Sequence, residues 1–465
     1  MKTLPLSLLA HMAGGELQGE DVVVDTVIQD TRSLQPGSLY VALRGERFDG
    51  HDFAYDAAMR GAAALLVEHA VAVELPQVIV ADTQLALARI ASGLQRDRGG
   101  TVVAITGSNG KTSVKTLVHS ILRRAGNTYL NPGNRNNEIG LPLAVIDAPD
   151  DADFAIYEMG AGKPGDIAYL TDIVTPQVAL VNNVAPAHLE RMGSLMGIAE
   201  TKGAIYSALP VDGIAVINAD DAFGAYFAER ASGRKILRFG LEASAEVGAR
   251  DIRSSAQGSQ FVMLAPEGEV AITLPLPGRH NVLNALAAAS LALACGVSLS
   301  TIAEGLAAVQ PVPGRQIARD LGNGVVLVDD SYNANPASLD AAMDALVAAA
   351  GESWLVLGDM RELGEQGAEL HAQAGRRAKA SGITRLYALG ALSGTAAGAF
   401  GEGARIFDSH AALADALRID LQKYVETRVA GQAALRVLIK GSRGSAMDRI
   451  VTALLSAREK TSHAA

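Results

Sequence analysis

Cysteine and aromatic residues are scarce in this sequence of 465 residues, which contains one cysteine, Cys295, and only 4% aromatic side chains. A single cysteine excludes a disulfide framework within the chain, so the sequence suits a reducing, cytoplasmic location. Cys295 lies in an apolar, alanine-rich stretch and is expected to fill space in a core. The 48 glycines, combined with so few aromatics, are typical of an α/β enzyme with many glycine turns.

Long hydrophobic runs and basic clusters are also missing. No apolar stretch reaches the roughly 18 residues that a membrane-spanning helix needs. The short apolar run after Lys2 is interrupted by Pro5 and Ser7, so we do not expect an export signal. The formal net charge is -10, and without a block of lysine and arginine the chain lacks the basic surface that nucleic acid or an anionic membrane would require.

Strand-like and helix-like segments alternate along the chain and predict an α/β protein of three domains. Residues 1–82 predict a small α/β unit. Residues 83–312 contain short apolar strands separated by helices, as expected for a parallel sheet covered on both faces, with an antiparallel flap near residues 259–276. A linker rich in proline and glycine at residues 310–316 ends this pattern. The alternation restarts in residues 313–465 and predicts a Rossmann-like domain.

A glycine-rich loop follows the first strand of the central domain, in the stretch AITGSNGKTSVKT of residues 104–116. The distance between its two glycines is two residues shorter than in the common P-loop, and the alternative is an ordinary glycine turn before a helix. Glycines at such a junction allow backbone N–H groups to approach an anion, and the helix N-terminus adds positive potential. We therefore predict a nucleotide phosphate site, in which Lys111 reaches the β- and γ-phosphates and the Thr112 hydroxyl serves Mg²⁺. Its residues are Gly107, Ser108, Asn109, Gly110, Lys111, Thr112 and Ser113.

Two further polar residues follow predicted strands of the same domain. Glu158 ends the strand DFAIYEMG, and His188 follows the strand QVALVNNV. Ligands gather at the carboxyl ends of parallel strands, and carboxylate and imidazole are acceptable Mg²⁺ or Mn²⁺ ligands. Beside the phosphate loop they predict a metal site, although a lone loop histidine is more often simply exposed. Lys202, in GIAETKGAIY, has on the sequence alone the pattern of a helix-surface lysine.

Asparagines open the helix in GRHNVLNALAAA. Asn281 and Asn284 are three residues apart and therefore share one helical face. Asparagine is a poor helix former, so two of them suggest hydrogen bonding to a flat polar group such as adenine. Capping of the helix is the alternative for either one.

The third predicted domain carries polar turns after its strands. Asp330 and Asn335 lie in VDDSYNANP, between a strand and a helix, and Asp359 lies in a similar loop in VLGDMRELG. Helix capping explains one residue of the first turn and leaves the others unexplained. Arg315 lies on the linker that precedes this domain, where it could move with the linker.

Taken in chain order, these motifs resemble the Mur ligases of peptidoglycan synthesis. The resemblance covers nearly the whole chain and rests on the segments TGSNGKT, GNRNNEIGLP, YEMGAGKPGDI, NNVAPAHLE, GRHNVLNALAA, VPGR, DDSYNANP and LGDMRELG. The shortened phosphate loop is the family's own form. The family has one domain for the UDP end of its substrate, one for ATP and one for the incoming amino compound. Its members transfer the γ-phosphate of ATP to a carboxylate, and an amine then attacks the acyl phosphate.

The resemblance implies ATP and Mg²⁺ as cofactors and small molecules as substrates. GNRNNEIGLP, DSYNANP and GDMRELG resemble the member that joins D-alanyl-D-alanine to UDP-N-acetylmuramoyl-tripeptide, and we expect a monomer. The rival ligases are folylpolyglutamate synthetase and the ligases that add a diamino acid, whose usual Asp-Asn-Pro-Arg motif is missing here. A nucleotide-regulated scaffold without turnover is an alternative of another class, and a P-loop motor or GTPase is a weaker one.

The resemblance also implies roles for individual residues. The catalytic residues are Lys111, Lys202, His188 and Asp330. The metal ligands are Thr112, Glu158, His188 and Lys202, of which the lysine is carbamylated in related ligases. Adenine, ribose or phosphate are held by Asn281, Asn284, Arg315, Asp330 and Asn335. Substrate is bound by Thr31, Arg32, Asn134, Asn136, Asn137 and Asp359. The chain has Ala204 two residues after Lys202, where many relatives have glutamate, and only Asp330 and His188 are candidates for the base that deprotonates the amine.

Overall fold

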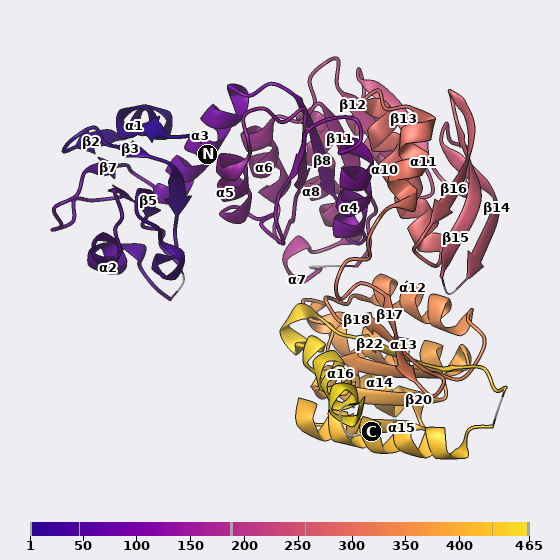
Figure 1. The fold of residues 1–465 in the computed structure, drawn as a ribbon. Coiled ribbons are helices and arrows are strands. Elements are labelled where there is room, and N and C mark those ends of the chain that lie inside the picture. The colour runs from indigo at the N-terminus through magenta and orange to yellow at the C-terminus, as the bar shows by residue number, and fades with distance from the viewer. Residues whose placement is uncertain (1, 46, 187–188, 256, 430, 463–465) are drawn as a thin grey trace.

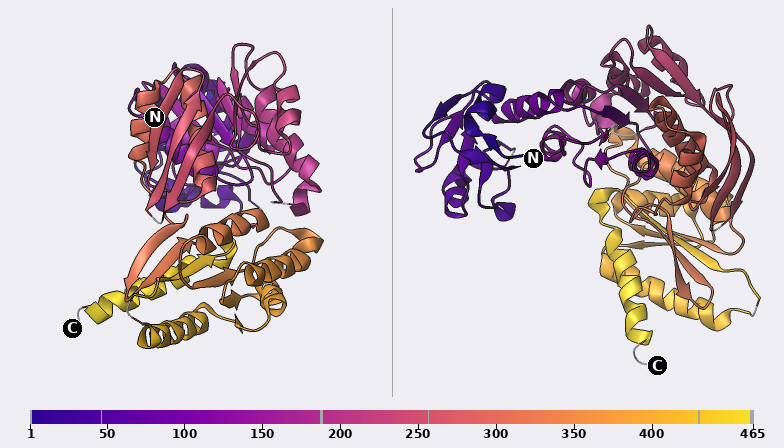
Figure 2. Two further views of the ribbon diagram at one scale, coloured as in Figure 1. Left: turned by 90° about the vertical axis from the view of Figure 1, so that its right-hand side faces the viewer. Right: turned by 45° about the horizontal axis from the view of Figure 1, so that its top comes forward.

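The computed structural model describes residues 2–45, 47–186, 189–255, 257–429 and 431–462. Three α/β bodies follow one another along the chain, from the indigo N-terminal part through the magenta central part to the orange and yellow C-terminal part (Figure 1). The N-terminal and C-terminal bodies both adjoin the central one, as the further views in Figure 2 also show. Within the described ranges, no helix is long and apolar enough to cross a membrane.

The N-terminal body is built on a five-stranded sheet, in which only the pairing of β2 with β7 is antiparallel. In sheet order its strands are β2 (Glu16–Gln18), β7 (Gln77–Ile79), β6 (Ala64–Val67), β5 (Ser38–Val41) and β4 (Thr26–Ile28). A small antiparallel pair and four short helical segments complete it, namely β1 (Leu4–Pro5), β3 (Val23–Val24), α1 (Leu6–Ala13), α2 (Ala54–Met59), η1 (Thr31–Ser33) and η2 (Gly50–Phe53).

Helix α3 (Thr83–Arg96) joins the first two bodies. It begins where the Asp82 side chain accepts a hydrogen bond from the Leu85 N–H, which caps its first turn. Leu87, Ile90 and Leu94 lie on one face and are buried in a core that also contains residues of both the N-terminal and the central sheet. Full burial of each such side chain contributes about 1.5–3 kcal/mol. The two bodies therefore share packing through α3, and the boundary at residue 82 stays a prediction.

The central body contains a six-stranded, fully parallel sheet, as predicted. Its strands, in sheet order, are β13 (Lys235–Phe239), β12 (Ile214–Asn218), β11 (Val178–Val181), β8 (Thr101–Thr106), β10 (Phe154–Glu158) and β9 (Thr128–Leu130). The predicted antiparallel flap is confirmed as β14 (Gly248–Ser255), β15 (Gly258–Ala265) and β16 (Gly268–Leu274).

Helices cover both faces of the central sheet, so each face has its own apolar core. One face packs against α5 (Gly140–Asp147), α6 (Asp166–Val174), α8 (Leu195–Ser207) and α9 (Gly224–Arg230), with the short α7 (Leu189–Met192) nearby. The other packs against α4 (Lys111–Leu122), α10 (Arg279–Ala294), α11 (Leu299–Ala307) and the flap. Strand β8, which leads into the phosphate loop, lies between β11 and β10 within the sheet.

The C-terminal body has a second six-stranded sheet, with only the β17–β18 pairing antiparallel. Its strands, in sheet order, are β17 (Ile317–Gly322), β18 (Val325–Asp330), β22 (Leu435–Lys440), β19 (Ser353–Gly358), β20 (Arg385–Leu389) and β21 (Ala404–Phe407). Two apolar cores lie against it. Its helical segments are α12 (Pro336–Val347), α13 (Gly367–Ala380), α14 (Ala391–Phe400), α15 (His410–Thr427), α16 (Asp448–Ser462), η3 (Gly364–Gln366) and η4 (Arg443–Ser445).

Close packing of α13 against α14 gives a stability prediction. A methyl group added at Gly375 of α13 would lie 2.0 Å from the carbonyl oxygen of Ala396 in α14. Gly375→Ala should therefore lower the free energy of unfolding by about 1–3 kcal/mol, since backbone has to move. The matched control is Gly398→Ala in α14, where a methyl group meets no atom within 4 Å and helix propensity favours alanine. Thermal unfolding of both variants is the measurement, and equal melting temperatures would contradict the packing described here.

Candidate functional site

A cavity of about 900 Å³ lies between the central and C-terminal bodies. Its lining combines the phosphate loop, the loop around Asn136, the first turns of α10, the linker and the turn between β18 and α12. A volume of this size is large enough for a nucleotide together with part of a second molecule. The residues predicted to bind nucleotide therefore come together, although they lie far apart in the sequence.

The phosphate loop has the backbone that its glycines permit. Gly107 and Gly110 have φ values of +150° and +78°, which other residues rarely adopt. A side chain at Gly110 would also meet Asn182 Nδ2 at 2.5 Å and Asn284 Oδ1 at 2.7 Å. No side chain caps α4, which starts at Lys111, so the free N–H groups of its first turn remain for a bound anion.

Two asparagines that follow β11 hold this loop in place, and the sequence analysis assigned neither of them. The Asn183 carbonyl accepts from the Ser108 N–H at 2.9 Å, and its side chain accepts from the Asn109 N–H at 2.8 Å. Asn182 Nδ2 donates to the Asn109 carbonyl at 3.0 Å. Their position directly after a predicted strand could have indicated a functional role, as it did for His188. The structure adds that this strand, β11, is a neighbour of β8 in the sheet.

Lys111 turns its ammonium back over the loop that precedes it. Its Nζ donates to the carbonyl oxygens of Gly107 at 2.7 Å and Ser108 at 3.4 Å. Burial lowers the pKa of Lys111, the nearby Glu158 carboxylate opposes this shift, and the Arg315 charge adds to it. The ammonium thus lies within the curve of the loop, where a bound phosphate would also lie.

Glu158 is buried at the end of β10, beside the first turn of α4. Its Oε2 accepts from the Thr112 hydroxyl at 3.0 Å, and its Oε1 accepts from Asn136 Nδ2 at 2.9 Å. Burial opposes the charge, but Lys115, Lys111 and these hydrogen bonds together hold the pKa of Glu158 below its ordinary value. The carboxylate is therefore ionised at neutral pH and stands next to the hydroxyl that was predicted to serve Mg²⁺.

Lys115 is part of this group, and the sequence analysis missed it. Its Nζ lies 3.2 Å from Glu158 Oε2 and donates to the carbonyls of Asn131 at 3.0 Å and Gly133 at 3.1 Å. The sequence could have indicated this, because Lys115 comes three residues after Thr112 and therefore shares its helical face. Lys115 thus compensates the buried carboxylate and joins α4 to the loop after β9.

Lys202 is buried and not exposed. Only 2% of its surface is accessible, so the helix-surface pattern suggested by the sequence alone is wrong. Burial lowers its pKa well below the ordinary value, the Lys111 charge adds to this, and Asp166 opposes it. The neutral amine is therefore favoured relative to an exposed lysine. His188, the other predicted ligand on this side, lies outside the described residues.

Asn281 and Asn284 line the cavity, and neither caps α10, whose N-cap is Gly278. The capping alternative is therefore wrong. Asn281 Nδ2 donates to the Pro277 carbonyl at 2.7 Å, and Asn284 Oδ1 accepts from Asn182 Nδ2 at 3.1 Å. Asn284 thus braces the phosphate loop from the neighbouring helix.

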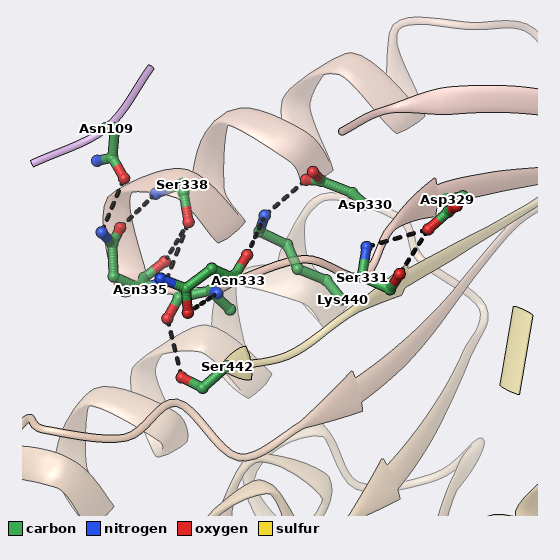
Figure 3. A network of polar contacts seen from close by, with 10 residues as sticks. Asn109, Asp329, Asp330, Ser331, Asn333, Asn335, Ser338, Lys440 and Ser442 are labelled. Atoms are coloured by element: carbon green, nitrogen blue, oxygen red, sulfur yellow. Dashed lines mark hydrogen bonds and ion pairs between the residues drawn. The ribbon is translucent and has the colours of Figure 1, made fainter. Parts of the chain in front are cut away.

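The C-terminal body reaches the phosphate loop directly. Asn335 caps α12, and its Nδ2 donates to Asn109 Oδ1 at 2.7 Å across a separation of 226 residues. Figure 3 shows Asn109 approaching this helix end from the other body. On the linker, Arg315 Nη2 donates to the Thr112 hydroxyl at 3.0 Å. The predicted phosphate loop is therefore contacted by two of the residues that were predicted to act with it.

Asp330 forms a buried ion pair at the end of β18, as Figure 3 also shows. Lys440 Nζ lies 2.6 Å from Asp330 Oδ2 and also donates to the Asn333 carbonyl at 3.0 Å. Lys440 ends β22, the strand that pairs with β18, and the sequence analysis did not single it out. Its signal was its position at the end of a predicted strand, directly before the polar residues 441–444.

The predicted substrate residues fall into three places. Asn134, Asn136 and Asn137 line the cavity near Glu158. Thr31 and Arg32 lie in the N-terminal body, outside this cavity, where Arg32 forms a double hydrogen bond with Asp30 and lowers its pKa to about 2. Asp359 is also absent from the cavity lining. Its Oδ1 accepts from the Ser393 N–H at 2.7 Å and hydroxyl at 2.8 Å, so it holds the start of α14.

Two of the predicted metal ligands, Thr112 and Glu158, are in contact beside the phosphate loop. Among the described residues, no group of three or more His, Cys, Asp or Glu side chains is arranged to hold a metal by itself. The Thr112 hydroxyl and the Glu158 carboxylate are nevertheless oxygen donors in contact at the phosphate loop. Mg²⁺ usually takes one or two protein carboxylates and completes its coordination with phosphate oxygens and water, so these residues fit it.

Comparisons with known proteins place the whole chain among one group of enzymes. Family models described as Mur ligase family, catalytic domain, Mur ligase middle domain and Mur ligase, glutamate ligase domain match residues 23–95, 105–292 and 314–443. A relative from Escherichia coli (strain K12), UDP-N-acetylmuramoyl-tripeptide--D-alanyl-D-alanine ligase, is 43% identical over 98% of this chain and 99% of its own length.

Solved structures agree with this similarity. The crystal structure of MurF from Acinetobacter baumannii matches with a TM-score of 0.92 and 32% identity, over 98% of this chain and all of that one. MurF ligase from Thermotoga maritima in complex with ADP matches with a TM-score of 0.82 and 29% identity, over 94% of this chain and 99% of that one. The three-part α/β architecture is therefore shared over essentially the full length.

Proposed function

The chain belongs to the Mur ligase family, and we propose that it is an ATP-dependent ligase that joins D-alanyl-D-alanine to UDP-N-acetylmuramoyl-tripeptide. The products are UDP-N-acetylmuramoyl-pentapeptide, ADP and phosphate, and the reaction serves peptidoglycan synthesis. The observation that carries the proposal is the cavity in which the phosphate loop meets the linker and the β18–α12 turn. This cavity brings elements of the central body, the linker and the C-terminal body to one place, where a nucleotide and two substrates could meet.

The chemistry requires such a site. A carboxylate is a poor electrophile, so the γ-phosphate of ATP is first transferred to it and supplies a leaving group. ATP and the carboxylate repel each other, and the Lys111 ammonium and the backbone N–H groups at the start of α4 offset this repulsion. Mg²⁺, held by Thr112, Glu158 and the nucleotide, would supply further positive charge when bound.

The C-terminal body protects the intermediate. Water would hydrolyse the acyl phosphate, so the cavity has to close over it. Asn335 and Arg315 hold the C-terminal body and the linker against the phosphate loop by contacts with Asn109 and Thr112. The amine of D-alanyl-D-alanine attacks the acyl carbon, and phosphate leaves. We propose that Asp330, whose carboxylate pairs with Lys440, contributes to nucleotide binding. Asp330 and His188 remain the two candidates for the base that deprotonates the amine.

Lys202 enters the proposal because burial lowers its pKa and so favours the neutral amine. A buried amine with a lowered pKa reacts readily with carbon dioxide, and the resulting carbamate carries two oxygens that can bind a cation. Ala204 replaces the acid that many relatives carry nearby, so this account uses no acid at that position. Thr31, Arg32, Asn134, Asn136, Asn137 and Asp359 remain proposed substrate residues.

The cellular setting follows from the substrates. ATP and a UDP-linked precursor are available in the cytoplasm, where the single free cysteine would stay reduced, so we propose a cytoplasmic enzyme. We also propose a monomer. Domain boundaries at residues 82 and 312 belong to the same proposal.

The purified protein should release phosphate from Mg-ATP only when both substrates are present. Each substrate is added alone and then together, and the product is identified by mass. Release that requires both, with formation of the pentapeptide, is the expected result, because a closed cavity excludes water and leaves the amine as the group that attacks the acyl phosphate. Turnover with a different acceptor or amine would replace the proposed substrates, and ATP hydrolysis without any carboxylate would favour a simple nucleotidase.

A further inference from the structure

One aromatic ring in the cavity carries two positively charged side chains. Tyr332 lies in the turn between β18 and α12, with the Arg315 guanidinium carbon 4.5 Å from its ring centroid and the Arg443 guanidinium carbon 5.5 Å from it. All three residues line the cavity. Both distances are within the range in which a guanidinium is attracted by the negative face of a ring.

The linker backbone is attached to the same residue. The Tyr332 N–H donates to the Gly314 carbonyl at 3.1 Å, directly before Arg315 in the chain. Gly314 has a φ of +72°, and a side chain there would lie 3.2 Å from Tyr332 Cβ. Arg315 is therefore held at two points by Tyr332, through the backbone of its neighbour and through its own guanidinium.

The held guanidinium points across to the phosphate loop, where its Nη2 donates to the Thr112 hydroxyl at 3.0 Å. A free arginine side chain has many rotamers, and fixing one of them opposes binding. Stacking on a ring that is itself fixed to the linker restricts these rotamers before the nucleotide arrives. The restriction then favours every contact that the guanidinium makes at the loop.

We propose that Tyr332 is a positioning residue, whose ring face holds Arg315 in place to contact the phosphates of ATP. The inference rests on the proposed function, because it takes Arg315 as a phosphate contact. It uses the ring and not the hydroxyl, so phenylalanine should replace tyrosine without loss. Arg443 lies farther from the ring and pairs with Asp448 at 3.7 Å, and we give it no role in this effect.

The test compares Tyr332→Phe, Tyr332→Leu, Arg315→Ala and the double variant Arg315→Ala/Tyr332→Leu. We expect Tyr332→Phe to keep kcat/KM for ATP within about twofold of the parent, while Tyr332→Leu lowers it by between about 2- and 30-fold, as the loss of a cation–π contact predicts. The KM for D-alanyl-D-alanine should stay the same in both variants. A ring that merely supports the fold would change both parameters and would lower the melting temperature in parallel.

The double variant decides how Tyr332 acts. If the ring works through Arg315, its removal costs nothing further once Arg315 is alanine, so the two effects are not additive. Additive effects, or a Tyr332→Leu variant with full activity, would overturn the inference. If Arg315→Ala alone leaves kcat/KM unchanged, the phosphate contact itself is wrong, and that failure belongs to the proposed function as well.

A second series keeps the shape of the ring and therefore does not depend on whether Tyr332→Leu folds. Phenylalanine carrying one, two or three fluorine atoms is incorporated at position 332, which progressively weakens the negative ring face. The expected result is a stepwise fall in kcat/KM for ATP as fluorine is added. Equal activity across the series would overturn the positioning role of the ring.

Discussion

The Lys111→Ala variant should lose ATP turnover almost completely while its fold persists. The Lys111 ammonium lies within the phosphate loop, 2.7 Å from the Gly107 carbonyl, and it is the loop's own positive side chain. Removal of one preorganised group that stabilises transition-state charge typically lowers kcat by about 10²- to 10³-fold. Phosphate release with both substrates present is the measurement, and the near-ultraviolet and far-ultraviolet circular dichroism spectra report on the fold.

A matched control separates this effect from the general loss of a lysine. Lys235, the first residue of β13, is exposed and lies outside the cavity lining, so Lys235→Ala should keep the parent activity. Parent-like turnover by Lys111→Ala would contradict the assignment of the phosphate loop. Equal losses in both variants would show that the assay responds to overall charge and not to this position.

The Lys202→Ala variant should also lose activity, and short carboxylates such as acetate should restore part of it. The lost group is a buried amine with a strongly lowered pKa, which we propose carries a carbamate. Truncation to alanine leaves a space in which an added carboxylate can place its two oxygens. The measurement is turnover as a function of acetate concentration, with sodium chloride at equal ionic strength as the reference.

Lys202→Met is the matched variant for this experiment. Methionine fills the space that alanine leaves open, so Lys202→Met should be inactive and acetate should not restore it. Full activity of either variant would show that the reaction does not require the Lys202 side chain. Inactivity of Lys202→Ala at every acetate concentration would contradict the carbamate and leave the lysine essential for another reason.

The stability of the parent protein should depend on pH through the same lysine. Burial holds the folded-state pKa of Lys202 well below 10.5, so between that pKa and 10.5 the unfolded chain binds more protons than the folded one. Stability relative to Lys202→Met should therefore rise as pH increases through this interval. Chemical unfolding of both proteins at several pH values, without added bicarbonate, measures the difference.

The fold class and the phosphate loop could be predicted from the sequence because both depend on local patterns. Strand β8, the glycines at 107 and 110 and the start of α4 are contiguous, and their spacing alone predicts their geometry. The alternation of apolar runs and helices likewise predicted the parallel sheets, which the structure confirms. These features need no knowledge of distant residues.

Contacts between distant segments could not be read in this way. Nothing in the sequence near Asn335 indicates that it meets Asn109, because the two lie in different bodies. The burial of Lys202, by contrast, was readable, because the lysine lies four residues from both Ile198 and Tyr206 on one buried helical face, and the interpretation as a surface lysine overlooked this spacing. Asp359 had the same local signal as Asp330, yet its carboxylate holds the start of α14 and does not line the cavity.

Transfer of a labelled oxygen tests the central claim most directly. UDP-N-acetylmuramoyl-tripeptide carrying oxygen-18 in the carboxylate that is joined to the amine is incubated with Mg-ATP, D-alanyl-D-alanine and the protein. If the carboxylate attacks the γ-phosphate, one labelled oxygen becomes the bridge of the acyl phosphate and leaves with phosphate, while the other stays in the new amide. The account predicts one labelled oxygen in each phosphate released. Formation of the amide together with unlabelled phosphate would contradict it.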